Sequence, residues 1–147
     1  IDSDMPVRGV ATSGWRGRSQ SLGIADSVTV LARTAAQADA AATIVANAVD
    51  VADARIKRRP AWQVRDDSDL GAIPVTVDVP ALPRELVARA LHQGLQKAQE
   101  LQSSGLLWFA LLACQGQLVA TSAPQTLANA VWPRNAAAES EVGSVFA

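Results

Sequence analysis

The stretch from Leu82 to Ala123, LPRELVARALHQGLQKAQELQSSGLLWFALLACQGQLVATSA, contains the clearest helix and the clearest hairpin of this chain. Apolar residues recur at helical spacing in its first half and predict a helix with one apolar stripe. The stripe consists of Val87, Leu91, Leu95, Ala98 and Leu101. Pro83 suits the first turn and Gly105 supplies the stop. The second half reads as two strands joined at CQGQ, with Gly116 in the turn.

The first arm of that hairpin, GLLWFALLAC, is continuously apolar. Such a run is typical of a central strand covered on both faces. The run is about ten residues long, which is too short to cross a bilayer. Cys114 lies at its end and is the chain's single cysteine, so no internal disulfide can form and a buried, inert thiol is predicted.

Upstream of this stretch the pattern predicts three more strands and a second long helix. The strands are Val7–Thr12, Asp26–Ala32 and Ile73–Val79, the last with Pro74 near its start. The helix runs from Ala35 to about Ala48, with Thr34 as its cap and Gln37 as the partner in a capping box. This order of elements predicts an α+β fold in which a mixed sheet packs against two long helices.

The composition bounds what the protein can do. The chain has 147 residues, 49% of them hydrophobic and 18% charged, which suits one globular domain over residues 1–147. The net charge of −1 leaves no basic excess to hold a phosphate backbone, so nucleic acid is not an expected partner. One cysteine and one histidine, His92, do not make a zinc site, and His92 is interpreted as structural or surface.

Two regions are interpreted as poorly ordered or solvated. The segment from Asp53 to Gly71 places four basic residues before an acidic group and reads as a solvated connection with internal charge pairing, or as an anion or subunit contact. Near the C-terminus, Thr126–Trp132 is a short helix candidate, and residues 136–147 read as a flexible tail.

A glycine-rich loop and a polar pair carry the candidate site. The loop, SGWRGRSQSLG, offers backbone N–H groups, serines and arginines that suit phosphate or carboxylate, although a plain surface loop is the alternative. In the helix that follows, Asp39 and Thr43 stand four residues apart and therefore share a face. Their oxygens suit a hard cation such as Mg²⁺. Alternatively, Thr43 bonds back to the Asp39 carbonyl and Asp39 faces water.

The stretch from Gly9 to Val49, GVATSGWRGRSQSLGIADSVTVLARTAAQADAAATIVANAV, resembles the later portion of the ApbE superfamily, the FAD:protein FMN transferases. It is most similar to a poorly characterised ApbE-like branch with the motifs TSG, GRS-S-LGIADSVTVLA and ADAAAT. The resemblance implies an ApbE-like, T-fold-related architecture, with this chain as a single domain or the C-terminal portion of a larger one.

The resemblance also implies the site residues. By position it assigns Mg²⁺ binding to Asp39, Thr43 and the carbonyl of Ala42. It assigns a flavin, FAD or FMN, to the loop residues and the residue that follows them: Thr12, Ser13, Gly14, Arg16, Arg18, Ser19, Ser21 and Asp26.

The chain departs from the transferases at one point. Their His-x-x-Asp-Pro-x-Thr-Gly signature falls where this chain has SQSLGIAD. We therefore expect an ApbE-like flavin- or nucleotide-related enzyme component assisted by Mg²⁺, in which FMN transfer itself is doubtful. The alternative is a non-catalytic accessory subunit that pairs with an N-terminal half. Relatives in the branch are linked by name to a hydroxynicotinate reductase, which adds a reductase-associated role by family association alone.

The expected partners are a small-molecule or flavin ligand and either a second copy or an N-terminal half on another chain. The N-terminal stretch IDSDMPVRG lacks the charged and then apolar pattern of a secretory signal peptide. The sequence therefore predicts a cytoplasmic protein with no membrane contact. Ile1 in place of Met indicates a processed chain or one piece of a longer protein, and it does not suit an autocatalytic hydrolase, whose first residue is Thr, Ser or Cys.

Overall fold

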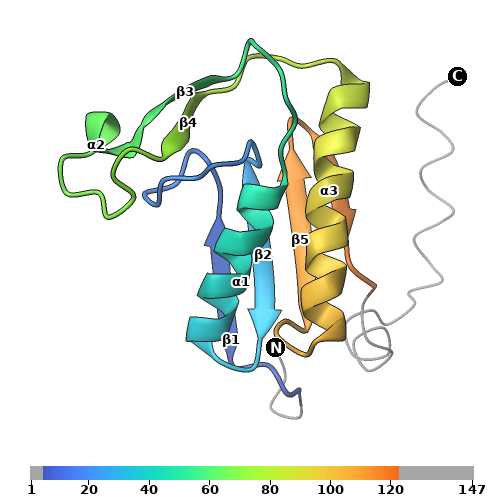
Figure 1. The fold of residues 1–147 in the computed structure, drawn as a ribbon. Coiled ribbons are helices and arrows are strands. Elements are labelled where there is room, and N and C mark those ends of the chain that lie inside the picture. The colour runs from blue at the N-terminus through green and yellow to red at the C-terminus, as the bar shows by residue number, and fades with distance from the viewer. Residues whose placement is uncertain (1–4, 123–147) are drawn as a thin grey trace, which may run out of the picture.

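A computed structural model describes residues 5–122 as a sheet layer, a helix layer and a projecting arm (Figure 1). The four-stranded sheet has the order β1 (Gly9–Ser13), β2 (Ser27–Ala32), β5 (Phe109–Cys114), β6 (Gln117–Ala120). Helices α1 (Ala35–Ala48) and α3 (Arg84–Ser103) cover one face of this sheet. The α+β class is as predicted.

Every strand pair in the sheet is antiparallel, so the prediction of a mixed sheet was wrong. The reason is that strand periodicity does not say which strands become neighbours or in which direction they pair. The β5–β6 connection is the tight hairpin that the sequence predicts. Gln115 has a φ of 44° and Gly116 a φ of 78°, and two positive φ values suit the right-handed twist of adjacent antiparallel strands. Inward residues of β2 and β5, such as Val28, Val30 and Leu112, are fully buried under the helices.

Helix α1 begins as predicted, because the Thr34 hydroxyl accepts a hydrogen bond from the Gln37 N–H at 3.2 Å. The second half of a capping box is absent: the buried Gln37 Oε1 has no hydrogen-bond partner among the described residues. The inward face of α1 is built largely from alanine, which lets the helix lie close to its neighbours.

Helix α3 also matches its prediction. It follows Pro83 and ends before Gly105, whose φ of 75° is the left-handed conformation of a helix stop. Val87 and Leu91 of the stripe are buried in the core. Gly94 sets the distance between the helices, because a Cβ there would lie 2.2 Å from Val49 Cγ2.

The arm consists of β3 (Lys57–Pro60), the one-turn helix α2 (Ala61–Val64) and β4 (Pro74–Asp78). β3 pairs antiparallel with β4, so the segment predicted as a connection contains a strand and a helical turn. Its internal charge pairing is confirmed by the Arg55–Asp53 pair at 2.7 Å and by the Arg65–Asp67 pair at 3.4 Å. Strand periodicity is hard to detect in four residues, KRRP, that carry three charges.

Several smaller predictions can also be compared with the structure. Cys114 is buried and His92 is exposed on α3, as interpreted. β5 is central, but Leu111 on its outer side is 40% exposed, so the strand is not covered on both faces by described residues. Over residues 5–122, no helix has the length and apolar character that a membrane span requires. The helix predicted at Thr126–Trp132 and the tail predicted at 136–147 lie outside the described residues.

Candidate functional site

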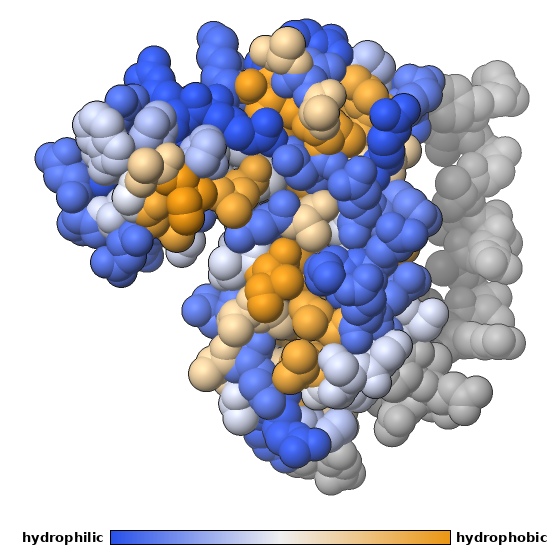
Figure 2. Space-filling view, viewed as in Figure 1, coloured by the Kyte–Doolittle hydropathy of each residue, from blue (hydrophilic) through white to orange (hydrophobic). Residues whose placement is uncertain are grey.

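A cleft of about 410 Å³ lies where the loop between β1 and β2, helix α1 and the arm meet. The space-filling view shows the surface hollowed between the arm and the body of the molecule (Figure 2). The residues that line the cleft are Ser19, Gln20, Leu22, Thr43, Asn47, Arg65, Asp67, Ser68, Asp69 and Leu70. Its size falls in the usual range for small-molecule sites.

Asn47 fixes the loop against α1. Its Oδ1 accepts hydrogen bonds from the Ser21 hydroxyl at 3.1 Å and from the Leu22 N–H at 2.9 Å. Gly23 permits this contact, since a Cβ there would lie 2.1 Å from the Ala46 carbonyl oxygen. The loop is therefore pressed onto the C-terminal half of the helix, and Ser19 comes to the same cleft as Thr43.

The arm is tied to the same loop by main-chain and side-chain hydrogen bonds. The Thr76 N–H donates to the Ser21 carbonyl at 2.8 Å, and Arg65 donates to the Arg18 carbonyl at 2.9 Å. Gln20 of the loop bonds the arm at two places. Its Nε2 donates to the Ala61 carbonyl at 2.9 Å, and its Oε1 accepts a hydrogen bond from the Ser68 hydroxyl. These bonds close one wall of the cleft with residues of the arm.

Most of the lining residues have polar side chains, and together they are slightly acidic. One arginine, Arg65, and two aspartates, Asp67 and Asp69, give it a formal charge of −1. Arg65 and Asp67 form an exposed ion pair, whereas Asp69 forms none with a described residue. The Thr43 hydroxyl is also free of hydrogen bonds within the described part of the chain. Such a lining disfavours a bare phosphate and favours a cation, or a phosphate that arrives with a cation.

Of the residues predicted to bind a cofactor, the structure brings Ser19 into the cleft and gives several others structural contacts. The hydroxyls of Thr12 and Thr29 bond each other at 2.9 Å on the outer side of the sheet. Ser21 is 2% exposed and bonds Asn47. Asp26 accepts a hydrogen bond from the Gln115 N–H at 2.6 Å and so holds the β5–β6 turn.

The remaining loop residues lie outside the cleft lining. Gly14 is buried, where a Cβ would lie 2.3 Å from the Asp26 carbonyl oxygen, and Ser13 before it is half-buried. Arg16 places its guanidinium over the Trp15 ring, 4.9 Å from the centroid. Arg18 is exposed, and its carbonyl oxygen is the one that Arg65 binds.

The three residues predicted to bind the metal are separated by their places on α1. Thr43 is half-buried and lines the cleft. Asp39 is exposed one turn earlier on the same face, outside the cleft lining. Ala42 is fully buried, with its side chain in the core. Within residues 5–122, no three His, Cys, Asp or Glu side chains gather in a way that would hold a metal by themselves.

The sequence reasoning missed Asn47 and the residues that the arm contributes. Asn47 could have been found, because it continues the four-residue spacing of Asp39 and Thr43 by one more turn. Arg65, Asp67 and Asp69 carried no such signal, because only the folding back of the arm brings them to α1.

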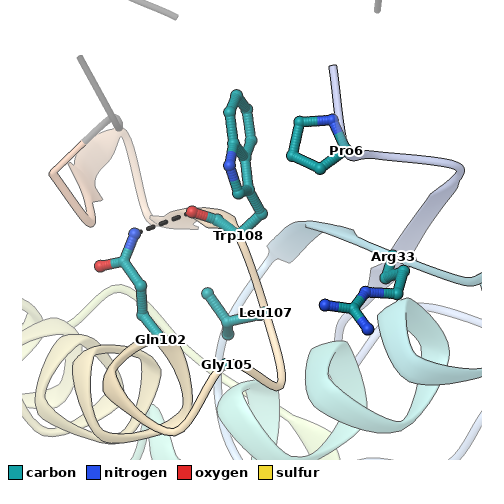
Figure 3. A pocket seen from close by; sticks show the side chains of 6 residues that line it. All are labelled: Pro6, Arg33, Gln102, Gly105, Leu107 and Trp108. Atoms are coloured by element: carbon teal, nitrogen blue, oxygen red, sulfur yellow. Dashed lines mark hydrogen bonds between the residues drawn. The ribbon is translucent and has the colours of Figure 1, made fainter. Parts of the chain in front are cut away.

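A second cavity, of about 320 Å³, lies at the opposite end of α1 and contains none of the predicted site residues (Figure 3). Its floor is Leu107, and Trp108, Pro6 and Arg33 stand around it. Gln102 donates to the Trp108 carbonyl at 2.8 Å and so holds the start of β5. We therefore take the cleft at Thr43 as the candidate functional site.

Comparison with known proteins adds one finding. A family model described as AbpE bacteria matches residues 1–120. No curated protein and no solved structure matches the chain.

Proposed function

The chain belongs to the AbpE bacteria family, and from that premise we propose that the cleft at Thr43 binds a flavin or a related nucleotide together with Mg²⁺. The observation that carries this proposal is the meeting of Ser19 and Thr43 in one cleft with an acidic wall. These two residues are far apart in the sequence, and the ApbE-like resemblance implies ligand contacts for both.

The donor set fits Mg²⁺. Beside Arg65 and two leucines, the lining of the cleft offers hydroxyl, amide and carboxylate oxygens, which a hard cation prefers. Thr43 and Asp39 would hold the ion, and water or ligand phosphate would complete its coordination. When bound, Mg²⁺ would neutralise phosphate charge and stabilise charge that develops there.

The chain's own residues would then position the ligand. Arg65 and Ser19 both line the cleft, with Arg65 bonded to the Arg18 carbonyl next to Ser19. Both suit phosphate oxygens, which arginine and hydroxyl groups bind well. Leu22 and Leu70 give the cleft an apolar part against which a ring system can pack. The acidic wall makes ligand binding dependent on the cation, because a phosphate alone would face Asp67 and Asp69.

Isothermal titration with FAD and with FMN, each with and without Mg²⁺, tests the proposal. We expect binding that requires Mg²⁺ and that weakens roughly 10- to 100-fold in Thr43→Val, because a hydrogen bond or ligand to a charged group contributes about 1.5–3 kcal/mol. Thr29→Val is the matched control, since that threonine lies on the side of the sheet away from the helices and is not among the residues assigned to the ligand. Equal titration curves for the wild type and Thr43→Val would remove the proposed site.

The second candidate function is a non-catalytic accessory subunit. The absence of the His-x-x-Asp-Pro-x-Thr-Gly signature from Ser19–Asp26 favours it. In this case, the cleft is indifferent to added flavin and Mg²⁺, and the purified protein is colourless. An absorbance spectrum taken with the titration separates the two candidates.

A further inference from the structure

The second cavity, which lies beside the N-terminal end of α1, combines an apolar floor with a single cation (Figure 3). The floor is Leu107, which is 4% exposed, and Pro6 and Trp108 add two rings to the lining. The polar side chains of the lining are Arg33 and Gln102. The volume of about 320 Å³ lies at the lower end of the range for small-molecule sites, so the cavity suits a small ligand.

Arg33 is the one charged residue among the described residues that line this cavity. It is exposed, and its guanidinium forms no ion pair or hydrogen bond with another described residue. Figure 3 shows the guanidinium directed toward the space over Leu107. Because the described lining contains no aspartate or glutamate, it leaves this positive charge unbalanced. A ligand with one negative charge would therefore find an available partner in Arg33.

The wall of the cavity at Trp108 is held by main-chain hydrogen bonds. The Trp108 N–H donates to the Leu31 carbonyl at 2.7 Å, and the Trp108 carbonyl accepts from Gln102 Nε2 at 2.8 Å. The turn before this wall is fixed as well, because the Gly105 N–H donates to the Gln102 carbonyl at 3.0 Å. The main chain around the cavity is therefore ordered before a ligand enters, which lowers the entropic cost of binding.

The lining distinguishes between classes of ligand by charge and polarity. A cation is disfavoured, because it would meet the Arg33 guanidinium and no carboxylate of the described lining. A bare phosphate or sulfate would lose water against Leu107 and the two rings and would gain only one cationic partner. A neutral apolar molecule would cover part of Arg33 without giving it an acceptor. A carboxylate attached to an apolar body matches both parts of the lining.

We propose that this cavity binds a small monocarboxylate with an apolar body, at a site separate from the cleft at Thr43. The carboxylate pairs with Arg33, whose planar guanidinium matches two carboxylate oxygens. The apolar body lies over Leu107 and against the Trp108 ring, where its surface is removed from water.

NMR titration of the ¹⁵N-labelled full chain with phenylacetate, phenylacetamide and acetate tests the proposal. Phenylacetamide keeps the apolar body and lacks the charge, whereas acetate keeps the charge and lacks the apolar body. We expect phenylacetate to bind at least about tenfold more tightly than either, because only phenylacetate uses both parts of the cavity. The amide signals of Leu107 and Trp108 should shift during the titration, and that of Thr43 should not.

The variant Arg33→Gln separates the contribution of the charge from that of the apolar body. It should weaken phenylacetate binding about tenfold and phenylacetamide binding by about threefold at most, because the neutral amide gains little from a guanidinium. Arg89→Gln is the matched control and should bind phenylacetate as the wild type does. Arg89 is also exposed and without a partner among the described residues, but it lies on α3 outside the cavity lining. Circular dichroism checks that both variants keep their fold.

The proposal is overturned if phenylacetate leaves the signals of Leu107 and Trp108 unshifted, or if acetate or phenylacetamide binds as tightly as phenylacetate. It is also overturned if Arg33→Gln binds phenylacetate with wild-type affinity, or if Arg89→Gln loses as much affinity as Arg33→Gln. The titrations with flavin and Mg²⁺ test the cleft separately, because neither variant changes a residue of the cleft lining.

Discussion

Replacing Asn47 with alanine should loosen the loop that forms the cleft. The Asn47 Oδ1 is the acceptor for the Ser21 hydroxyl at 3.1 Å and for the Leu22 N–H at 2.9 Å. Ser21 is 2% exposed, so its hydroxyl has little access to water once this acceptor is gone. Asn47→Ala therefore leaves two donors without their acceptor, one of them deeply buried.

The free energy of unfolding should fall by about 1.5–3 kcal/mol in Asn47→Ala. Each buried donor that loses its acceptor costs about 1–3 kcal/mol. Water can reach the Leu22 N–H through the open cleft, and alanine has the higher helix propensity by roughly 0.5 kcal/mol, so the sum is reduced. A loss of this size is a large part of the 5–15 kcal/mol that holds a typical domain together.

Urea unfolding followed by circular dichroism and tryptophan fluorescence measures the change. Asn47→Asp is the matched variant, because a carboxylate oxygen can accept both hydrogen bonds. It places a negative charge near the C-terminal end of α1, which costs about 0.3–1 kcal/mol. The expected order of stability is wild type, then Asn47→Asp, then Asn47→Ala. The reasoning is refuted if Asn47→Ala lies within about 0.5 kcal/mol of the wild type, or if Asn47→Asp is the less stable variant.

Two further predictions concern single side chains. Burial raises the pKa of the Cys114 thiol to about 11. A thiol reagent at pH 8 should therefore leave the folded protein unmodified and should react with one thiol per chain in denaturant. Modification of the folded protein would contradict this prediction. Hydrogen bonds from Arg55 lower the pKa of Asp53 to about 2, so this pair favours the folded state above pH 4 and loses its contribution as the pH falls toward 2. Arg55→Ala should return that pKa toward 3.8 in an NMR titration, and an unchanged value would disprove the pairing.

The local elements were predictable because short-range patterns specify them. The Thr34 cap, the apolar stripe of α3 and the stop at Gly105 each depend on residues a few positions apart, and each was found where the pattern placed it. The CQGQ turn is of the same kind. The sheet prediction failed in its strand direction, because helical and strand periodicity do not say which strands become neighbours.

The candidate site was predictable in part. The sequence predicted Thr43 as a metal ligand, from its place on the helix face and from the family resemblance, and Ser19 as a ligand contact from the resemblance. The structure places both residues in one cleft. Asp26 was assigned to the ligand for the same reason, but its carboxylate bonds the Gln115 N–H, a partner 89 positions away. No pattern within the loop could reveal that partner.

By itself the sequence determined the two long helices, the hairpin and the α+β class, since hydrophobic period, caps and turn residues act within one element. Only the tertiary structure decided the cleft and the side of the four-stranded sheet that faces away from α1 and α3, whose outward strand positions are uncharged. The cleft exists because Asn47 holds the loop on α1 and because the arm folds back to present Asp67 and Asp69. That uncharged side exists because outward positions of four strands, some of them distant in the chain, come into register. Both arise from contacts between elements, and those contacts depend on how whole surfaces pack together.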